Sequence, residues 1–160
     1  MTSAETRQAA QYFYDTFLGC SFSPSAKKLT SDFFTFTKQF IDESSYPDEL
    51  KYDLHTSLYT YLKVSHHPTI QVATFASEYL ETPVQKDNYQ KFMAEKGVPT
   101  NDFPRDLTYI VNKLKHRNLK FTSHVTIVGP SNNFNELVKI KGQEDGSTIV
   151  SIEGKVEHQD

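Results

Sequence analysis

Apolar residues follow a helical period along roughly the first two thirds of the chain. A capping box at Thr2 opens an amphipathic segment that a helix-ending Gly19 closes. A second segment begins at Ser25, which can cap a helix, and runs to residue 41. Its apolar positions are Leu29, Phe33, Phe36 and Phe40. The helical spacing of apolar residues in these two segments predicts two helices, each with one buried face.

The same period continues with interruptions up to residue 115. Pro47 stands where the first residue of a third helix is expected, and Asp48 and Glu49 favour a helix N-terminus. A fourth, shorter helix is predicted from a cap at Thr69 to residue 80. A weaker fifth covers residues 85–96 and ends at Gly97, and one more short helix is predicted over residues 106–115.

After residue 117 the period becomes alternating, which is typical of strands. Phe121, Val125 and Ile127 would share one face of a strand. A turn is predicted over residues 129–133, and the Asp145-Gly146 pair predicts a tight hairpin turn between two further strands. The expected fold is therefore α+β: five or six helices (residues 3–116) followed by a small antiparallel sheet of three to four strands (residues 118–153). These form a single domain over residues 1–160.

Composition limits how the protein can use its surface. Aromatic residues make up 13% of the chain, so few and bulky side chains are expected to build the core. The formal net charge of −3 argues against a protein that coats nucleic acid by its overall charge. Any nucleic-acid contact must therefore come from a local patch.

The chain carries no signal that points away from the cytoplasm. Cys20 is its single cysteine, which excludes an internal disulfide framework and fits a reducing compartment. No apolar run approaches the roughly 20 residues that span a bilayer, and the polar N-terminus lacks the apolar region of a signal peptide. We expect a cytoplasmic protein without a membrane partner.

No motif in the sequence predicts a catalytic or metal centre. His55, His66 and His67 lack the spacing of zinc ligands, and glycine-rich phosphate loops are absent. Nothing in the sequence supplies a base for Cys20. We therefore expect no metal, no cofactor and no catalysis.

A run of basic residues is the most informative local feature. Between residues 113 and 120 no acidic residue interrupts the cations, and two further lysines alternate with apolar residues on a later strand. The candidate DNA contacts are Lys113, Lys115, Arg117, Lys120, Lys139 and Lys141. Lys120, His124, Lys139 and Lys141 would share one basic face if the sheet leaves that face in water. The alternative is a solvated helix end that carries ordinary lysines.

The aromatic stripes allow two interpretations. The simplest places them in the core, and the other makes part of them an interface to a second copy or another protein. The candidate interface residues are Phe13, Phe17, Phe33, Phe36 and Phe40.

Several segments resemble the C-terminal half of bacterial nucleoid-associated proteins of the NdpA type. They are residues 9–20 (AAQYFYDTFLGC), 25–40 (SAKKLTSDFFTFTKQF), 89–98 (YQKFMAEKGV), 103–106 (FPRD) and the strand series 119–152. The resemblance covers residues 9–152 and rests on the order and spacing of structural, aromatic positions. Members of that family usually have an additional N-terminal half, so we expect this chain to correspond to their C-terminal domain.

The resemblance implies a protein of the bacterial nucleoid without a catalytic centre or cofactor. Two functional hypotheses follow. The first is a domain that contacts DNA weakly and nonspecifically through the basic patch. The second is a protein–protein interaction or dimerisation module of a chromosome-associated protein, and an enzyme is a distant third.

Overall fold

The computed structural model describes residues 24–65 and 67–160. The first predicted helix, which contains Phe13 and Phe17, lies outside these residues, as do Cys20 and His66.

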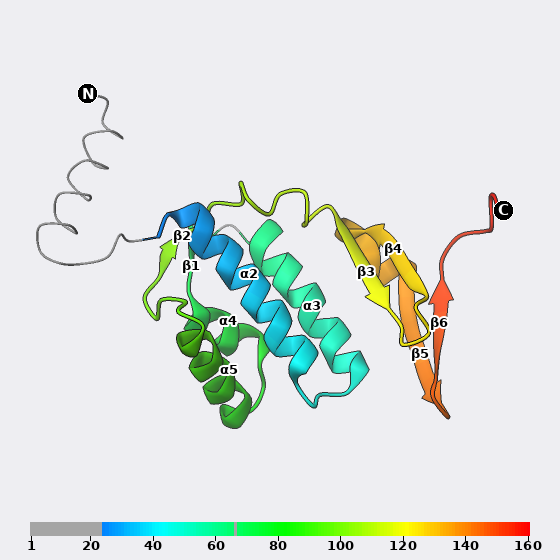
Figure 1. Ribbon diagram of the computed structural model, residues 1–160, viewed down its shortest axis with the longest axis horizontal. Coiled ribbons are helices and arrows are strands. Elements are labelled where there is room, and N and C mark those ends of the chain that lie inside the picture. The colour runs from blue at the N-terminus through cyan, green and yellow to red at the C-terminus, as the bar shows by residue number, and fades with distance from the viewer. Residues whose placement is uncertain (1–23, 66) are drawn as a thin grey trace, which may run out of the picture.

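Four helices form the larger part of the described fold (Figure 1). They are α2 (Ala26–Glu43), α3 (Asp48–Lys63), α4 (Val72–Tyr79) and α5 (Pro83–Glu95). The predicted cap of α2 is confirmed, because the Ser25 side chain accepts a hydrogen bond from the backbone N–H of Lys28. Pro47 lies one position outside α3, at its N-cap. Gly97 follows α5 with a φ of 86°, as its predicted helix-ending role requires.

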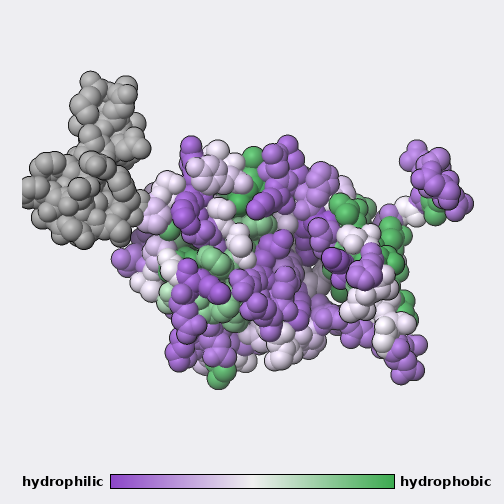
Figure 2. Space-filling view, viewed as in Figure 1, coloured by the Kyte–Doolittle hydropathy of each residue, from purple (hydrophilic) through white to green (hydrophobic). Residues whose placement is uncertain are grey.

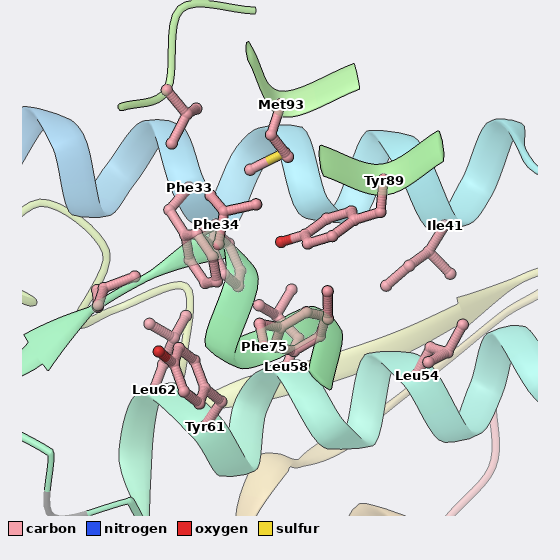
Figure 3. Packing of buried hydrophobic residues seen from close by; sticks show 14 of the residues in the cluster. Phe33, Phe34, Ile41, Leu54, Leu58, Tyr61, Leu62, Phe75, Tyr89 and Met93 are labelled. Atoms are coloured by element: carbon pink, nitrogen blue, oxygen red, sulfur yellow. The ribbon is translucent and has the colours of Figure 1, made fainter. Parts of the chain in front are cut away.

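The helices enclose an aromatic core, as the composition predicts (Figure 3). Phe33 of α2 and Phe75 of α4 pack edge to face, with ring centroids 5.9 Å apart. Deep in the core the hydroxyls of Thr37 and Tyr89 share a hydrogen bond of 2.7 Å, and both residues are fully buried. Burial raises the pKa of Tyr89. The polar groups of this core are therefore paired with each other.

A small sheet closes one end of the helical part. Its strands β1 (Thr69–Ile70) and β2 (Phe103–Pro104) pair antiparallel. Thr69 was predicted to cap the fourth helix, but it belongs to β1, and Gln71 holds the N-cap position of α4.

The short helix predicted over residues 106–115 is wrong, because residues 108–114 form turns and no helix is present in this segment. Asp106 begins it with a local turn in which its carboxylate accepts from the backbone N–H and the hydroxyl of Thr108. Ile110 and Leu114 are buried in the helical core. Tertiary burial of these two side chains and the local competition from Asp106 therefore outweigh the helical tendency.

Two separate hairpins complete the fold. The strands β3 (His116–Lys120) and β4 (Thr126–Pro130) form one, and β5 (Val138–Glu144) and β6 (Ser147–Ile152) form the other. A 3-10 turn η1 (Ser131–Asn133) and the short helix α6 (Phe134–Leu137) connect them. The α+β class is confirmed. The predicted single sheet of three to four strands is wrong, because the described strands form three two-stranded sheets.

Turn chemistry explains both the error and the success in the β part. His124 has a φ of 71°, and the N–H of Phe121 donates to the carbonyl of Val125, so the chain reverses where one continuous strand was expected. The predicted hairpin turn is confirmed, since Asp145 and Gly146 have φ angles of 42° and 81°.

A second, smaller hydrophobic cluster attaches the hairpins to α3. Tyr52, Phe134 and Val138 are its buried members, and Leu119, Ile127, Leu137, Ile140 and Val150 pack against them. The Tyr52 hydroxyl donates to the backbone carbonyls of Phe134 and Val138. Because an isolated two-stranded hairpin is marginal in water, this cluster is what stabilises the β part. Among the residues that the structure describes, no helix is both long and apolar enough to cross a bilayer.

Candidate nucleic-acid interface

Five of the six predicted DNA contacts are exposed. They are Lys113, Lys115, Lys120, Lys139 and Lys141. Within residues 24–65 and 67–160, none of these lysines forms an ion pair with a carboxylate. Their ammonium groups are therefore available to an anionic ligand.

Arg117 is the exception, since only 5% of its surface is exposed. Alternation along β3 places Arg117 and Leu119 on the face turned toward α3. The Arg117 guanidinium donates to Thr56 Oγ1 at 2.6 Å and to the backbone carbonyl of Tyr52 at 3.3 Å. The prediction of Arg117 as a contact on an open surface is thus corrected: the side chain packs between the hairpins and α3.

Aromatic rings surround this buried cation. The guanidinium carbon lies 4.9 Å from the ring centroid of Phe134, 5.0 Å from that of Tyr52 and 5.5 Å from that of Tyr59. Among the described residues no carboxylate pairs with Arg117. Burial lowers its pKa, although a guanidinium stays charged at neutral pH. Burying a cation costs several kcal/mol, and the three ring contacts, at about 1–2 kcal/mol each, together with the two hydrogen bonds return a similar amount, although no negative charge balances the guanidinium.

A groove of about 410 Å³ opens beside Arg117, between the helices α2 and α3 and the two hairpins. Four cations line it, namely Lys38, Lys51, Arg117 and Lys120, together with the two carboxylates of Asp42 and Asp48. Four positive charges against two negative ones leave an excess of two positive charges in the groove. This local sign is opposite to that of the whole chain.

The pKa of Lys38 is lowered by burial and in part by two neighbouring cations. Burial lowers this pKa; Asp42 opposes the effect, and the charges of Lys113 and Arg117 add to it. Lys113 also lies beside Lys38 at a second hollow, which Asp42 and Glu43 line as well. Lys113 is therefore close to the groove cations, although the second hollow itself carries balanced charge.

Asp42 is the best-anchored carboxylate of the groove. Its Oδ1 lies 2.8 Å from Nε2 of His55. Burial alone would raise the pKa of Asp42, but the hydrogen bond with His55 and the charges of His55, Lys38 and Lys51 together lower it below its usual value. The Lys51 ammonium also donates to the backbone carbonyl of Asp42 at 3.0 Å.

The predicted basic residues therefore divide into two groups. Lys113 and Lys120 join Lys38 and Lys51 around the groove. Lys139 alternates along β5 with Val138 and Ile140, which pack in the second cluster, so it points away from that cluster, and Lys141 lies at the bulge that follows Ile140. Lys38 and Lys51 escaped prediction because they look like ordinary solvated positions of α2 and α3, and only the tertiary fold brings β3 to them.

The three aromatic candidates in the described part of the chain pack on the core rather than forming an exposed surface. Phe33 is fully buried in the core, which corrects its assignment as an interface residue. Phe36 and Phe40 are partly buried against the same core, and the Phe40 ring lies 5.2 Å from that of Tyr89. Phe13 and Phe17 lie outside the described residues. Within the described part of the chain, no group of three or more His, Cys, Asp or Glu side chains could hold a metal ion.

Comparison of the sequence with protein families identifies the class. Residues 1–147 match a model of nucleoid-associated proteins, which confirms the resemblance noted in the sequence. The chain belongs to this family, that of the nucleoid-associated protein YejK. Comparison with curated proteins and with solved structures gives no match.

Proposed function

We propose that this chain is a non-catalytic domain of the bacterial nucleoid that contacts DNA weakly and without sequence preference. Family membership supports its place among nucleoid-associated proteins. The observation that carries the DNA contact is the set of five exposed lysines without described acidic partners in a chain of net charge −3. Lys120 lines the groove, Lys113 lines the second hollow beside α2, Lys115 directly precedes β3, and Lys139 and Lys141 lie on β5.

The chemistry of these residues favours phosphate contact over base reading. Lysine ammonium groups bind phosphate as point charges, and such contacts position a protein on DNA without reporting its sequence. The acidic remainder of the chain opposes association and keeps the affinity in the range of nonspecific binding, about 10⁻⁴ to 10⁻⁶ M.

A charge-matched pair of variants tests the proposal. The variant K113Q/K115Q/K120Q removes three exposed cations of the basic run between residues 113 and 120, and K27Q/K86Q/K91Q removes three lysines of α2 and α5. Both lower the net charge by the same amount, so only position differs between them. In fluorescence anisotropy with two duplexes of unrelated sequence, we expect the first variant to lose affinity for both and to show a salt dependence about 3 units shallower. Equal losses in the two variants, or wild-type affinity in the first, would contradict the proposal.

Protein interaction is a second candidate, and a different observation favours it. Large apolar side chains are exposed on the hairpins, namely Val125, Val128, Ile149 and Ile152. Figure 2 shows hydrophobic surface over the hairpins, whereas the helical part is mostly hydrophilic in that view. These exposed side chains support the hairpins, rather than the described phenylalanines, as the surface for this second candidate. If it is correct, light scattering at micromolar concentration will show an assembly that the variant V128S/I149S dissociates, whereas a strict monomer that captures no nucleoid protein would argue against it.

A further inference from the structure

We propose that the groove beside Arg117 is a phosphate-binding site, with Arg117 at its buried side and Lys38, Lys51 and Lys120 around its opening. This site differs from the open lysine surface above, because its central residue is fixed by packing. It does not rest on the proposed DNA contact, since any phosphate-bearing ligand would satisfy it.

The donors of Arg117 give the first argument. A guanidinium has five N–H groups, and the contacts with Thr56 and Tyr52 use two of its nitrogens. The side chain lines the groove, so the remaining donors are close to any ligand held there. Three rings orient the guanidinium plane before a ligand arrives. A pre-oriented planar fork is the arrangement that recognises phosphate through paired hydrogen bonds.

Charge balance gives the second argument. Arg117 has no carboxylate partner in the described part of the chain, so an anion in the groove would supply the missing negative charge. The two carboxylates of the groove already have donors: Asp42 pairs with His55, and Asp48 accepts from Gln143. Because the four cations exceed these two carboxylates, the groove favours an anion over a cation.

Size gives the third argument. A volume of about 410 Å³ falls within the range of small-molecule sites, roughly 300–1,000 Å³. It accommodates a phosphate together with part of a nucleoside. The phosphate therefore has two possible sources, the backbone of a DNA strand or the terminal phosphate of a free nucleotide, and both present the same chemistry.

Titration of the full chain with inorganic pyrophosphate, followed by backbone amide NMR, tests the site directly. We expect saturable shifts in residues of α2, α3 and β3 that line the groove. The variant K120Q removes an exposed cation without disturbing the core and should weaken binding about 2- to 5-fold. The variant R117M should weaken it about 10-fold or more, because charge-assisted donors are lost. The control K91Q removes an exposed lysine of α5 and should bind as the wild type does.

The outcomes separate the site from a general attraction of anions. Shifts spread equally over all lysines, or K120Q and R117M variants that bind like K91Q, would overturn the proposal. A second titration in the presence of a short duplex identifies the source of the phosphate. Displacement of the duplex by pyrophosphate assigns the groove to the DNA backbone, and simultaneous binding assigns it to a free ligand. Loss of duplex binding in K139Q/K141Q with pyrophosphate binding unchanged would support a phosphate site in the groove that is separate from the lysines of β5.

Discussion

Replacement of Arg117 by methionine separates what this residue does for stability from what it does for binding. The substitution keeps a long side chain between α3 and the hairpins while it removes the charge. Three ring contacts and two hydrogen bonds are lost, but so is the cost of holding an unpaired cation away from water. Neither hydrogen-bond partner is left alone, because the Thr56 hydroxyl still donates to the Tyr52 carbonyl at 3.1 Å.

These terms nearly cancel, so we expect R117M to change the free energy of unfolding by less than about 1 kcal/mol. R117A removes the same charge and leaves a cavity among the rings, so we expect it to cost about 2–4 kcal/mol. Equilibrium urea denaturation of the three proteins, with coincident transitions by fluorescence and circular dichroism, measures both values. A loss above about 2 kcal/mol in R117M would refute this reasoning and make Arg117 a structural anchor.

Three further predictions concern the core, one carboxylate and one turn. T37V leaves the buried Tyr89 hydroxyl without its partner and should cost about 1–3 kcal/mol, whereas the double variant T37V/Y89F should cost less than the sum of the single changes in urea denaturation. The pKa of Asp42 is lower in the folded protein than in the unfolded chain, where it is near about 4, so its contribution to stability is present above that pH and is lost as the pH falls through the lower, folded pKa. The difference in unfolding free energy between wild type and D42N should therefore shrink below about pH 4, and a constant difference would contradict the account. G146A forces alanine to a φ of 81° and should destabilise the second hairpin by about 1 kcal/mol, visible as faster amide exchange in β5 and β6 but not in α2.

The helical part follows closely from local sequence. Ser25 caps α2, and the apolar stripe of that helix points into the core. At residues 106–115 the same reasoning fails, because burial of Ile110 and Leu114 depends on distant helices that local periodicity does not represent. Local sequence is thus sufficient to predict a helix that has its own cap and apolar stripe, and insufficient where tertiary contacts determine the backbone conformation.

The β part and the site show the same division. Asp145-Gly146 predicts its turn because the residue types require that backbone, whereas the positive φ of His124 has no comparable signal. The basic run between residues 113 and 120 predicts a positive patch, and four of its cations are Lys113, Lys115, Arg117 and Lys120. Its actual composition, with Arg117 turned inward and Lys38 and Lys51 added from the helices, depends on how β3 packs against α3.

The salt dependence of DNA binding by the full chain tests the central claim most directly. Titrating a duplex at several salt concentrations gives the slope of log K against log salt, which counts the phosphates that the protein neutralises. With five exposed lysines engaged, we predict a slope of about −4 to −5 that is the same for duplexes of unrelated sequence. A slope near zero, or no binding even at low salt, would contradict the assignment of DNA contact to this chain.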